Sequence, residues 1–174
     1  SCATDGSKNA EGPAPDGEEY FAMALFFAAD RWGNGTGIFH YADEARAILR
    51  ECIHKGEPGH PGEPMWDTSR HLIKFITNCN FSDPSYHLPH FYELFARWAD
   101  EDDREFWRDA AEASRAYLHL ACHPDTGLSA EYAEYDGTPH EGHQEIFGRH
   151  DWYYSDAYRT IANIAMDWLW FGRD

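Results

Sequence analysis

Basic residues are scarce in this sequence, and the shortage limits which partners it can have. It contains 14 lysines and arginines against 31 aspartates and glutamates, a formal net charge of -17. A surface of this sign repels nucleic-acid phosphates and anionic lipid headgroups, so we expect no nucleic-acid or membrane partner. An aromatic content of 16% beside so many carboxylates suits a neutral, polar ligand that stacks on rings, although acidity also simply favours solubility.

Paired cysteines and long apolar runs are also missing. The four cysteines, at positions 2, 52, 79 and 122, form no C-x-x-C pair, which argues against a zinc knuckle or a dithiol redox site. Unpaired thiols favour a cytoplasmic protein. No run approaches the roughly 18 apolar residues of a membrane span, and SCATDGSKNAEG does not resemble a signal peptide. We therefore expect a soluble chain without a targeting segment.

Nucleotide and nucleophile motifs are absent as well. The sequence has no G-x-G-x-x-G, P-loop or G-x-S-x-G, which removes nucleotide binding and serine hydrolase chemistry as leading interpretations. Histidines are plentiful in the loop at 140–150 and near 87–90, but none stands in an H-E-x-x-H pattern or beside a placed carboxylate ligand. We expect neither a metal nor another cofactor.

The apolar residues that are present predict helices. Five segments have helical patterns, namely 18–31, 41–54, 86–99, 102–121 and 155–171. The first, third and fifth are apolar on nearly every face, whereas the second and fourth carry an apolar stripe on one side. This alternation predicts an all-α fold in which an inner ring of helices is wrapped by an outer ring. LIKFI at 72–76 is a candidate short strand.

The length is too small for a closed ring. Six helical hairpins need on the order of 400 residues, and this chain has 174. We therefore predict a single domain over 1–174 that is the central fragment, about half, of a larger toroid of helical hairpins. Such a fragment should expose apolar surface from its three inner helices and tend to aggregate.

Three predicted inner helices open with side chains that can do chemistry. Asp16 lies in P-D-G-E-E, where Glu19 three residues later suggests a capping box. Ser155 can cap the last helix and leave Asp156 free to act as a base. Tyr86 opens the middle one. If the three helices share a direction, these side chains gather at one mouth, where carboxylates beside a phenol can position a water.

Arg159 follows Asp156 by three residues and lies on the same predicted helix face. It either forms an ordinary exposed ion pair with Asp156 or supports a neighbouring carboxylate. Each of these residues alone is a weak indication of function. Their convergence is the prediction that a structure can test.

The stretches PAPDGEEYFAMALFFA, FSDPSYHLPHFYELF and SDAYRTIANI, with others along nearly the whole chain, resemble glycoside hydrolase family eight. The resemblance is strongest to the reducing-end xylose-releasing exo-oligoxylanases of that family. It implies an (α/α)6 barrel, inversion at the anomeric carbon and no metal. The implied reaction is a single displacement that releases xylose from the reducing end of short β-1,4-xylo-oligosaccharides, with no obligate protein partner.

The resemblance also implies roles for individual residues. Asp156 matches the general base that activates water, and Asp16 matches the residue that binds and distorts the sugar before the scissile bond. Tyr86 matches the tyrosine that positions the water, and Arg159 the arginine that supports the carboxylates. Tyr154 joins Asp16, Tyr86 and Arg159 among the substrate-binding residues.

The sequence departs from the family pattern at two places. The family's general acid is a glutamate in a glycine-flanked motif that lies upstream of this region, so the chain alone is expected to be inactive. The loop between Asp136 and Asp156 is longer and richer in histidine than in the xylanase branch, which leaves the substrate open. An endo-acting xylanase, β-glucanase or chitosanase of the same family remains an alternative, as does a non-catalytic carbohydrate-binding helical module.

Overall fold

The computed structural model describes residues 3–8, 12–144 and 148–173. Its α-helices are α1 (Pro15–Trp32), α2 (Tyr41–His54), α3 (Pro89–Trp98), α4 (Arg104–Ala121) and α5 (Tyr158–Phe171). Short 3-10 helices lie at Gly37–Phe39, Pro84–Tyr86, Glu101–Asp103 and Ser155–Ala157. Two small antiparallel hairpins pair β1 (Trp66–Asp67) with β2 (Leu72–Ile73) and β3 (His143–Gln144) with β4 (Gly148–Arg149).

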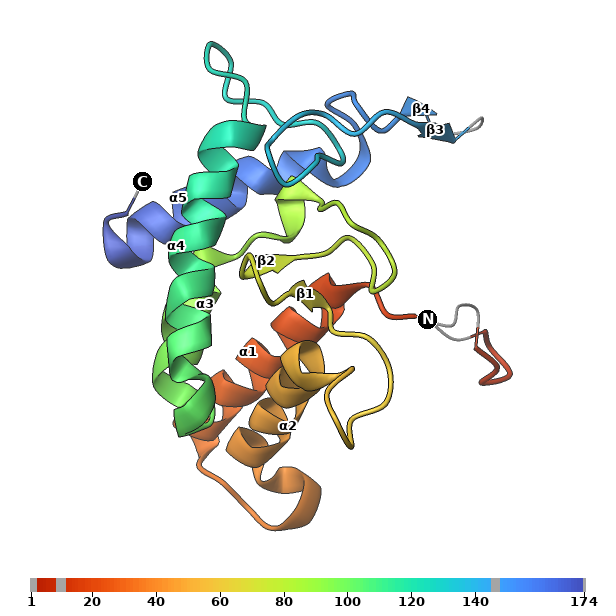
Figure 1. Ribbon diagram of the computed structural model, residues 1–174. Helices are drawn as coiled ribbons and strands as arrows, with labels where there is room; N and C mark the ends of the chain where they lie inside the picture. Colours follow the sequence, from red (N-terminus) through yellow and green to blue (C-terminus); the bar gives the residue numbers. More distant parts are fainter. Residues whose placement is uncertain (1–2, 9–11, 145–147, 174) are drawn as a thin grey trace.

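Helical hairpins are the building unit of the fold. α1 packs along α2, and α3 packs along α4 (Figure 1). The predicted bounds of α2 are confirmed, and its buried side includes Ala45, Leu49 and Cys52, which recur at the three- and four-residue spacing of one helix face. α4 buries a comparable stripe and leaves its opposite side to solvent. Both helices are therefore outer helices, as their patterns predict.

α1 and α3 run in the same direction. The Tyr20 and Phe91 rings, near the start of each helix, lie 5.3 Å apart between centroids. Further along both helices the Phe26 and Phe95 rings lie 6.1 Å apart. Contacts that advance together along two helices require parallel axes, so the first turns of α1 and α3 lie at the same end.

α5 has this direction too. Arg159, in its first turn, contacts Asp16 in the first turn of α1. Near the other end, the Trp170 ring lies 6.2 Å from the ring of Phe27 on α1. The three helices with apolar patterns thus begin on one side of the molecule, and residues far apart in the sequence meet there.

The core lies between the two hairpins and the β1–β2 ribbon. Trp66 of β1 makes an edge-to-face contact with Trp107 of α4, with ring centroids 5.2 Å apart. Phe95 of α3 contacts the same Trp107 ring at 5.1 Å, and all three side chains are fully buried. Aromatic pairs of this geometry add specificity to the area they bury. The predicted strand at 72–76 is limited to Leu72–Ile73, which turns the chain back over this core.

The predicted starts of three helices are wrong by two or three residues. The segments predicted to begin at 86, 102 and 155 begin as α-helices at Pro89, Arg104 and Tyr158, each preceded by a 3-10 helix. Only the first segment starts early, at Pro15, because proline suits the first helical position. These 3-10 turns are where two of the candidate site residues lie.

The prediction that the fragment exposes apolar surface from its inner helices is confirmed for α1 and α5. On α1, Phe21 is 67% exposed and Trp32 75% exposed, and on α5 Trp168 is 63% and Leu169 72% exposed. α3 exposes less, since Phe91, Tyr92 and Phe95 are buried and its other apolar residues are at least partly buried. Exposed apolar side chains of this size are typical of surfaces that another segment covers. Among the described residues, no helix is long and apolar enough to cross a membrane.

The side of α5 that packs on the rest of the chain is polar. Asp167 accepts hydrogen bonds of 2.7 and 2.8 Å from Arg115 of α4, and Asn163 donates one of 2.8 Å to the Ser85 carbonyl. Thr160 completes the buried face. α5 thus turns Thr160, Asn163 and Asp167 inward and leaves Trp168 and Leu169 exposed, which hydropathy alone does not reveal.

Candidate active site

Arg159 joins two carboxylates that come from different helices. Its Nη1 donates to Asp16 Oδ2 at 3.1 Å, and its Nη2 donates to Asp156 Oδ2 at 2.7 Å. The Asp156 side chain is 48% exposed, the Asp16 side chain 25% and Arg159 22%. Charge-assisted bonds of this kind fix the position of both carboxylates. The structure therefore brings together three of the predicted site residues in an open position.

Asp16 lies in the first turn of α1 but does not cap it. Ala14 occupies the N-cap position without a side-chain bond, and Pro15 is the first helical residue. The predicted capping box of Asp16 with Glu19 is therefore wrong, because proline advances the helix start and places Asp16 inside the first turn. A carboxylate there still meets the positive end of the helix dipole, and its side chain remains available to Arg159.

Asp156 lies in the 3-10 helix Ser155–Ala157 that leads into α5. Ser155 does not cap this helix, contrary to the prediction, because Tyr154 occupies the N-cap position and makes no side-chain bond. Ser155 instead has a φ of 46°, in the left-handed region that non-glycine residues rarely enter. Strained backbone beside a functional side chain is a recurrent feature of active sites.

Tyr86 lies beneath the arginine. It ends the 3-10 helix Pro84–Tyr86, three residues before α3, and is 5% exposed. The guanidinium carbon of Arg159 is 5.5 Å from the centroid of its ring, a cation–π distance. Burial, followed by the charges of Asp16 and Asp83, raises the pKa of the Tyr86 phenol above its usual value. The phenol is therefore neutral and can both donate and accept a hydrogen bond.

Tyr154 is the predicted site residue that the structure places least firmly. It is half-buried and lies two residues before Asp156, and its ring carbons come within 3.7 Å of the position that a Cβ on Gly148 would occupy. Among the described residues, no hydrogen bond or ion pair joins it to Arg159. It flanks the group without being fixed to it.

Asp83 belongs to this group although the sequence analysis does not single it out. Its side chain is 1% exposed, and its Oδ1 accepts the backbone N–H of Ser85 at 2.7 Å. Burial raises the pKa of Asp83 to about 7, against the opposing charge of Arg159. An aspartate before proline and serine indicates an ordinary turn cap, so nothing in the sequence distinguishes it from other capping residues.

Glu19 is a second residue with an unpredicted position. It is fully buried, one helical turn after Asp16, and neither carboxyl oxygen has a hydrogen-bond partner among the described residues. Burial raises the pKa of Glu19 well above its usual value, and the neighbouring Tyr92 offsets part of the rise. The sequence gives no sign of this burial, because a glutamate in the first turn of a helix is normally exposed.

The loop that borders the site stacks aromatic rings with histidines. The ring of His140 lies 3.8 Å from that of Phe81, nearly parallel to it. Tyr132 lies 4.1 Å from Phe75 and 4.6 Å from His150, measured between ring centroids. The histidine-rich stretch thus packs against the segment that precedes Tyr86.

Glutamates fix both of these histidines. His140 Nδ1 lies 2.6 Å from a carboxyl oxygen of Glu134, and His150 Nδ1 lies 2.7 Å from one of Glu131. The side chain of His143, the third histidine of the loop, lies outside the described residues. Among the side chains that are described, no three His, Cys, Asp or Glu residues are grouped as a metal site would require.

The two histidines near α3 are structural. His87 is fully buried, its Nε2 lies 2.8 Å from Ser82 Oγ and its Nδ1 lies 2.9 Å from Ser114 Oγ. Burial lowers the pKa of His87 to about 3, and that of His90 to about 4. Both rings are therefore neutral, and they serve packing in this structure.

Comparison with known proteins gives the class first. Residues 1–174 match the family described as Glycosyl hydrolases family 8, so the chain belongs to glycoside hydrolase family 8. It is 61% identical over 173 residues to the reducing-end xylose-releasing exo-oligoxylanase Rex8A of Paenibacillus barcinonensis. The aligned region covers 99% of this chain and 45% of the relative. The structure of Rex8A complexed with xylose superposes with a TM-score of 0.92, over the same shares of the two chains.

Other relatives extend the range of named activities. A reducing-end xylose-releasing exo-oligoxylanase of Halalkalibacterium halodurans is 60% identical over 173 residues, covering 99% of this chain and 43% of the relative. Endoglucanase 2 of Ruminiclostridium josui is 33% identical over 170 residues, covering 95% of this chain and 32% of the relative. The solved relatives are (α/α)6 barrels, of which this chain covers about half. The predicted all-α half-barrel is thus confirmed.

Proposed function

We infer that this chain forms the water-activating part of an inverting glycosidase that releases xylose from the reducing end of short β-1,4-xylo-oligosaccharides. The observation that carries the proposal is the bridge from Asp16 to Asp156 through Arg159, with the Tyr86 ring beneath it. Relatives named as reducing-end xylose-releasing exo-oligoxylanases at 58–61% identity support the substrate class.

Each side chain then has a role that its surroundings allow. Asp156 is the most exposed member of the group, and it takes the proton of the attacking water as general base. Tyr86 holds that water with its neutral phenol. Asp16 binds and distorts the sugar before the scissile bond, while Arg159 keeps the two carboxylates in place. Tyr154 contributes to the wall against which the sugar binds.

An inverting reaction also needs a general acid, roughly 6.5 to 9.5 Å from the base. Glu19 cannot fill this role, because its side chain has no exposed surface through which it could reach a leaving group. We place the acid outside these 174 residues and predict that the chain alone is inactive. The remainder of the barrel would supply the acid and cover the apolar faces of α1 and α5.

The proposal is tested with the full-length protein and xylotriose. Proton NMR during hydrolysis should show xylose and xylobiose as products, and the new reducing end should first appear as the α-anomer. A β-anomer as first product, or no hydrolysis at all, would contradict the proposal. The isolated 174-residue chain should bind xylobiose weakly or not at all by titration calorimetry. Tight binding by that chain would favour a carbohydrate-binding module.

An endo-acting enzyme is the second candidate, because relatives named endoglucanases share 29–33% of their residues with this chain. Product analysis on xylan, mixed-linkage β-glucan and chitosan separates the two. Release of xylose one unit at a time, with an oligosaccharide one unit shorter left behind, supports exo action. Long oligosaccharides that accumulate from a polymer support endo action.

A further inference from the structure

The segment from Ser82 to His87 is irregular, buried and held at many points. Ser82 exchanges backbone hydrogen bonds of 2.9 Å in both directions with Ala133, and its Oγ donates to the Ile73 carbonyl at 2.7 Å. His87, at the other end, is held by Ser82 and by Ser114 of α4. These buried hydrogen bonds hold both ends of the segment in place.

Tyr86 is the side chain that this segment presents to the site. Its backbone N–H donates to the Asp83 carbonyl at 3.0 Å, which closes the 3-10 turn. Its own carbonyl accepts from the Tyr92 hydroxyl at 3.4 Å. These bonds fix the backbone from which the phenol projects, and the side chain itself, only 5% exposed, is packed beneath Arg159.

Asp83 holds the turn from inside. Its Oδ1 accepts the Ser85 N–H at 2.7 Å, and on the outer side Asn163 of α5 donates to the Ser85 carbonyl at 2.8 Å. The two bonds hold the peptide units on either side of the Ser85 Cα, immediately before Tyr86. When it is ionised, Asp83 also faces the guanidinium of Arg159 and stabilises its positive charge.

We propose that Asp83 is a positioning residue, which fixes the Tyr86 phenol beneath Arg159 through its hydrogen bond to Ser85. It touches neither water nor sugar, because only 1% of it is exposed. The groups that face it are Arg159 and Asp156 at the start of α5, Tyr86, Tyr117 of α4 and Tyr132 of the bordering loop. The inference rests on the proposed function, since Asp83 holds the turn that carries Tyr86, the tyrosine proposed to position the water.

A double-mutant cycle in the full-length protein tests this proposal. Asp83→Ala should lower kcat on xylotriose by about 100-fold, because misplacement of a catalytic group by about 1 Å costs that much, while KM changes little. In a Tyr86→Phe background the same substitution should lower kcat by less than about 3-fold, because Asp83 affects the reaction only through the Tyr86 hydroxyl, which that background already lacks. Equal losses in both backgrounds would overturn the proposal.

Two further variants keep the result interpretable. Asp83→Asn retains an oxygen that accepts the Ser85 N–H and should restore most of kcat; a loss as large as that of Asp83→Ala contradicts the proposal. If Asp83→Ala does not fold, Asp83→Ser replaces it in the cycle. Its shorter side chain weakens the bond to the Ser85 N–H, so it should lose part of kcat, and that loss should disappear in the Tyr86→Phe background.

The matched control is Asp136→Ala. Asp136 makes the same turn, with its Oδ1 accepting the Thr138 N–H at 2.9 Å, but it is exposed and outside the Arg159 group. Its substitution should leave kcat within about 2-fold of wild type, as ordinary surface changes do. If the wild-type protein does not hydrolyse xylotriose, the proposed function fails. If the wild-type protein hydrolyses xylotriose but Asp83→Ala lowers kcat equally in both backgrounds, only the proposed role of Asp83 is wrong.

Discussion

Two arginines in this molecule each hold carboxylates from other helices, but in opposite surroundings. Arg115 donates to Asp167 from both Nε and Nη2, and its Nη1 pairs with Glu93 and Glu112 at 3.0 Å. That group lies mid-helix, with Asp167 2% exposed. The Arg159 group lies at helix starts, and each of its two carboxylates gives the arginine one oxygen.

The difference shows what makes a charge cluster functional. In the Arg115 group the contacts to Glu93 and Asp167 lie between helices and fasten α3, α4 and α5 to one another, while only Glu112, on the same helix as Arg115, is exposed. In the Arg159 group Asp156 is half exposed and keeps an oxygen that makes no hydrogen bond to the described residues. A cluster that is satisfied internally stabilises the fold, whereas one with a spare, accessible acceptor can act on a ligand.

The largest effect we expect is on turnover, and it separates the two clusters. Asp156→Asn in the full-length protein should lower kcat on xylotriose by roughly 10²- to 10⁴-fold, the usual contribution of a general base. Its midpoint of urea unfolding should stay close to that of wild type. Steady-state kinetics and urea titration measure both. An unchanged kcat would contradict the assignment of Asp156 as the general base.

The second prediction concerns the buried cluster. Asp167→Ala leaves the Arg115 charge buried beside two remaining glutamates and should cost about 3 to 5 kcal/mol of unfolding free energy. Urea unfolding of the full-length protein measures the loss. Asp167→Asn, which keeps one acceptor, should cost less. A loss below about 1 kcal/mol for the alanine variant would show that this cluster contributes no more to stability than an exposed ion pair.

The third prediction uses pH, because Asp83 lies behind the open cluster. Its pKa is about 7 in the folded chain against a usual value of 3.8, so the folded state retains a proton that the unfolded chain loses. The stability that this carboxyl contributes is complete below about pH 4 and is lost as pH rises toward 7. His87, with a pKa of about 3, acts in the opposite sense, since its contribution is complete above about pH 6.5 and is lost as pH falls.

The two groups therefore oppose each other between about pH 4 and 6.5. Relative to wild type, Asp83→Asn should make stability rise more steeply with pH across this range, by up to about 1.4 kcal/mol per pH unit. His87→Gln should make it fall with pH. Urea unfolding at half-unit pH intervals measures the slopes. Parallel curves for wild type and both variants would refute these protonation states.

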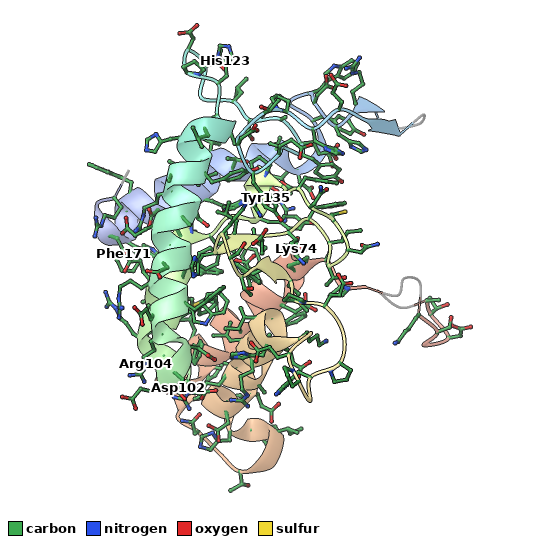
Figure 2. All side chains as sticks on the ribbon, viewed as in Figure 1. Lys74, Asp102, Arg104, His123, Tyr135 and Phe171 are labelled. Carbon is green, nitrogen blue, oxygen red and sulfur yellow. The ribbon has the colours of Figure 1, made fainter. Side chains whose placement is uncertain are left out.

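The smallest effect should come from a third arginine. Arg50 of α2 pairs with Asp100, and both side chains are over a third exposed. They line one hollow with Arg104, which lies at the end of α4 away from His123 (Figure 2). Arg50→Ala should change the unfolding free energy by less than about 1 kcal/mol, because water and salt screen such pairs. A larger loss would mean that exposure does not distinguish the clusters.

The sequence predicts the helices well where one face decides the outcome. The stripe of α2 gives its bounds to the residue, because a period of three to four residues needs no knowledge of distant partners. α5 is the opposite case, since its buried residues are Thr160, Asn163 and Asp167. Whether an apolar residue of α5 faces inward depends on segments far along the chain. The apolar pattern of α5 therefore predicts more burial than these 174 residues provide.

The candidate site is predictable in its visible parts only. Asp16, Tyr86 and Asp156 stand at expected helix starts, and the shared direction of α1, α3 and α5 brings them together. Asp83 and Glu19 escape prediction, because in sequence each is an ordinary acid near a turn or helix start. Their unusual state comes from tertiary burial, which only the folded chain creates.

The ion pair of Arg159 with Asp16 spans 143 residues of sequence, and this separation has a consequence for synthesis. At about 5 to 20 residues per second, the ribosome adds Arg159 roughly 7 to 29 s after Asp16. During that interval α1 has been made, but α5 has not. The nascent chain thus displays an acidic helix start and the Phe27 ring, which Trp170 contacts later, without their partner, and a chaperone that binds apolar segments would meet α1 before α5.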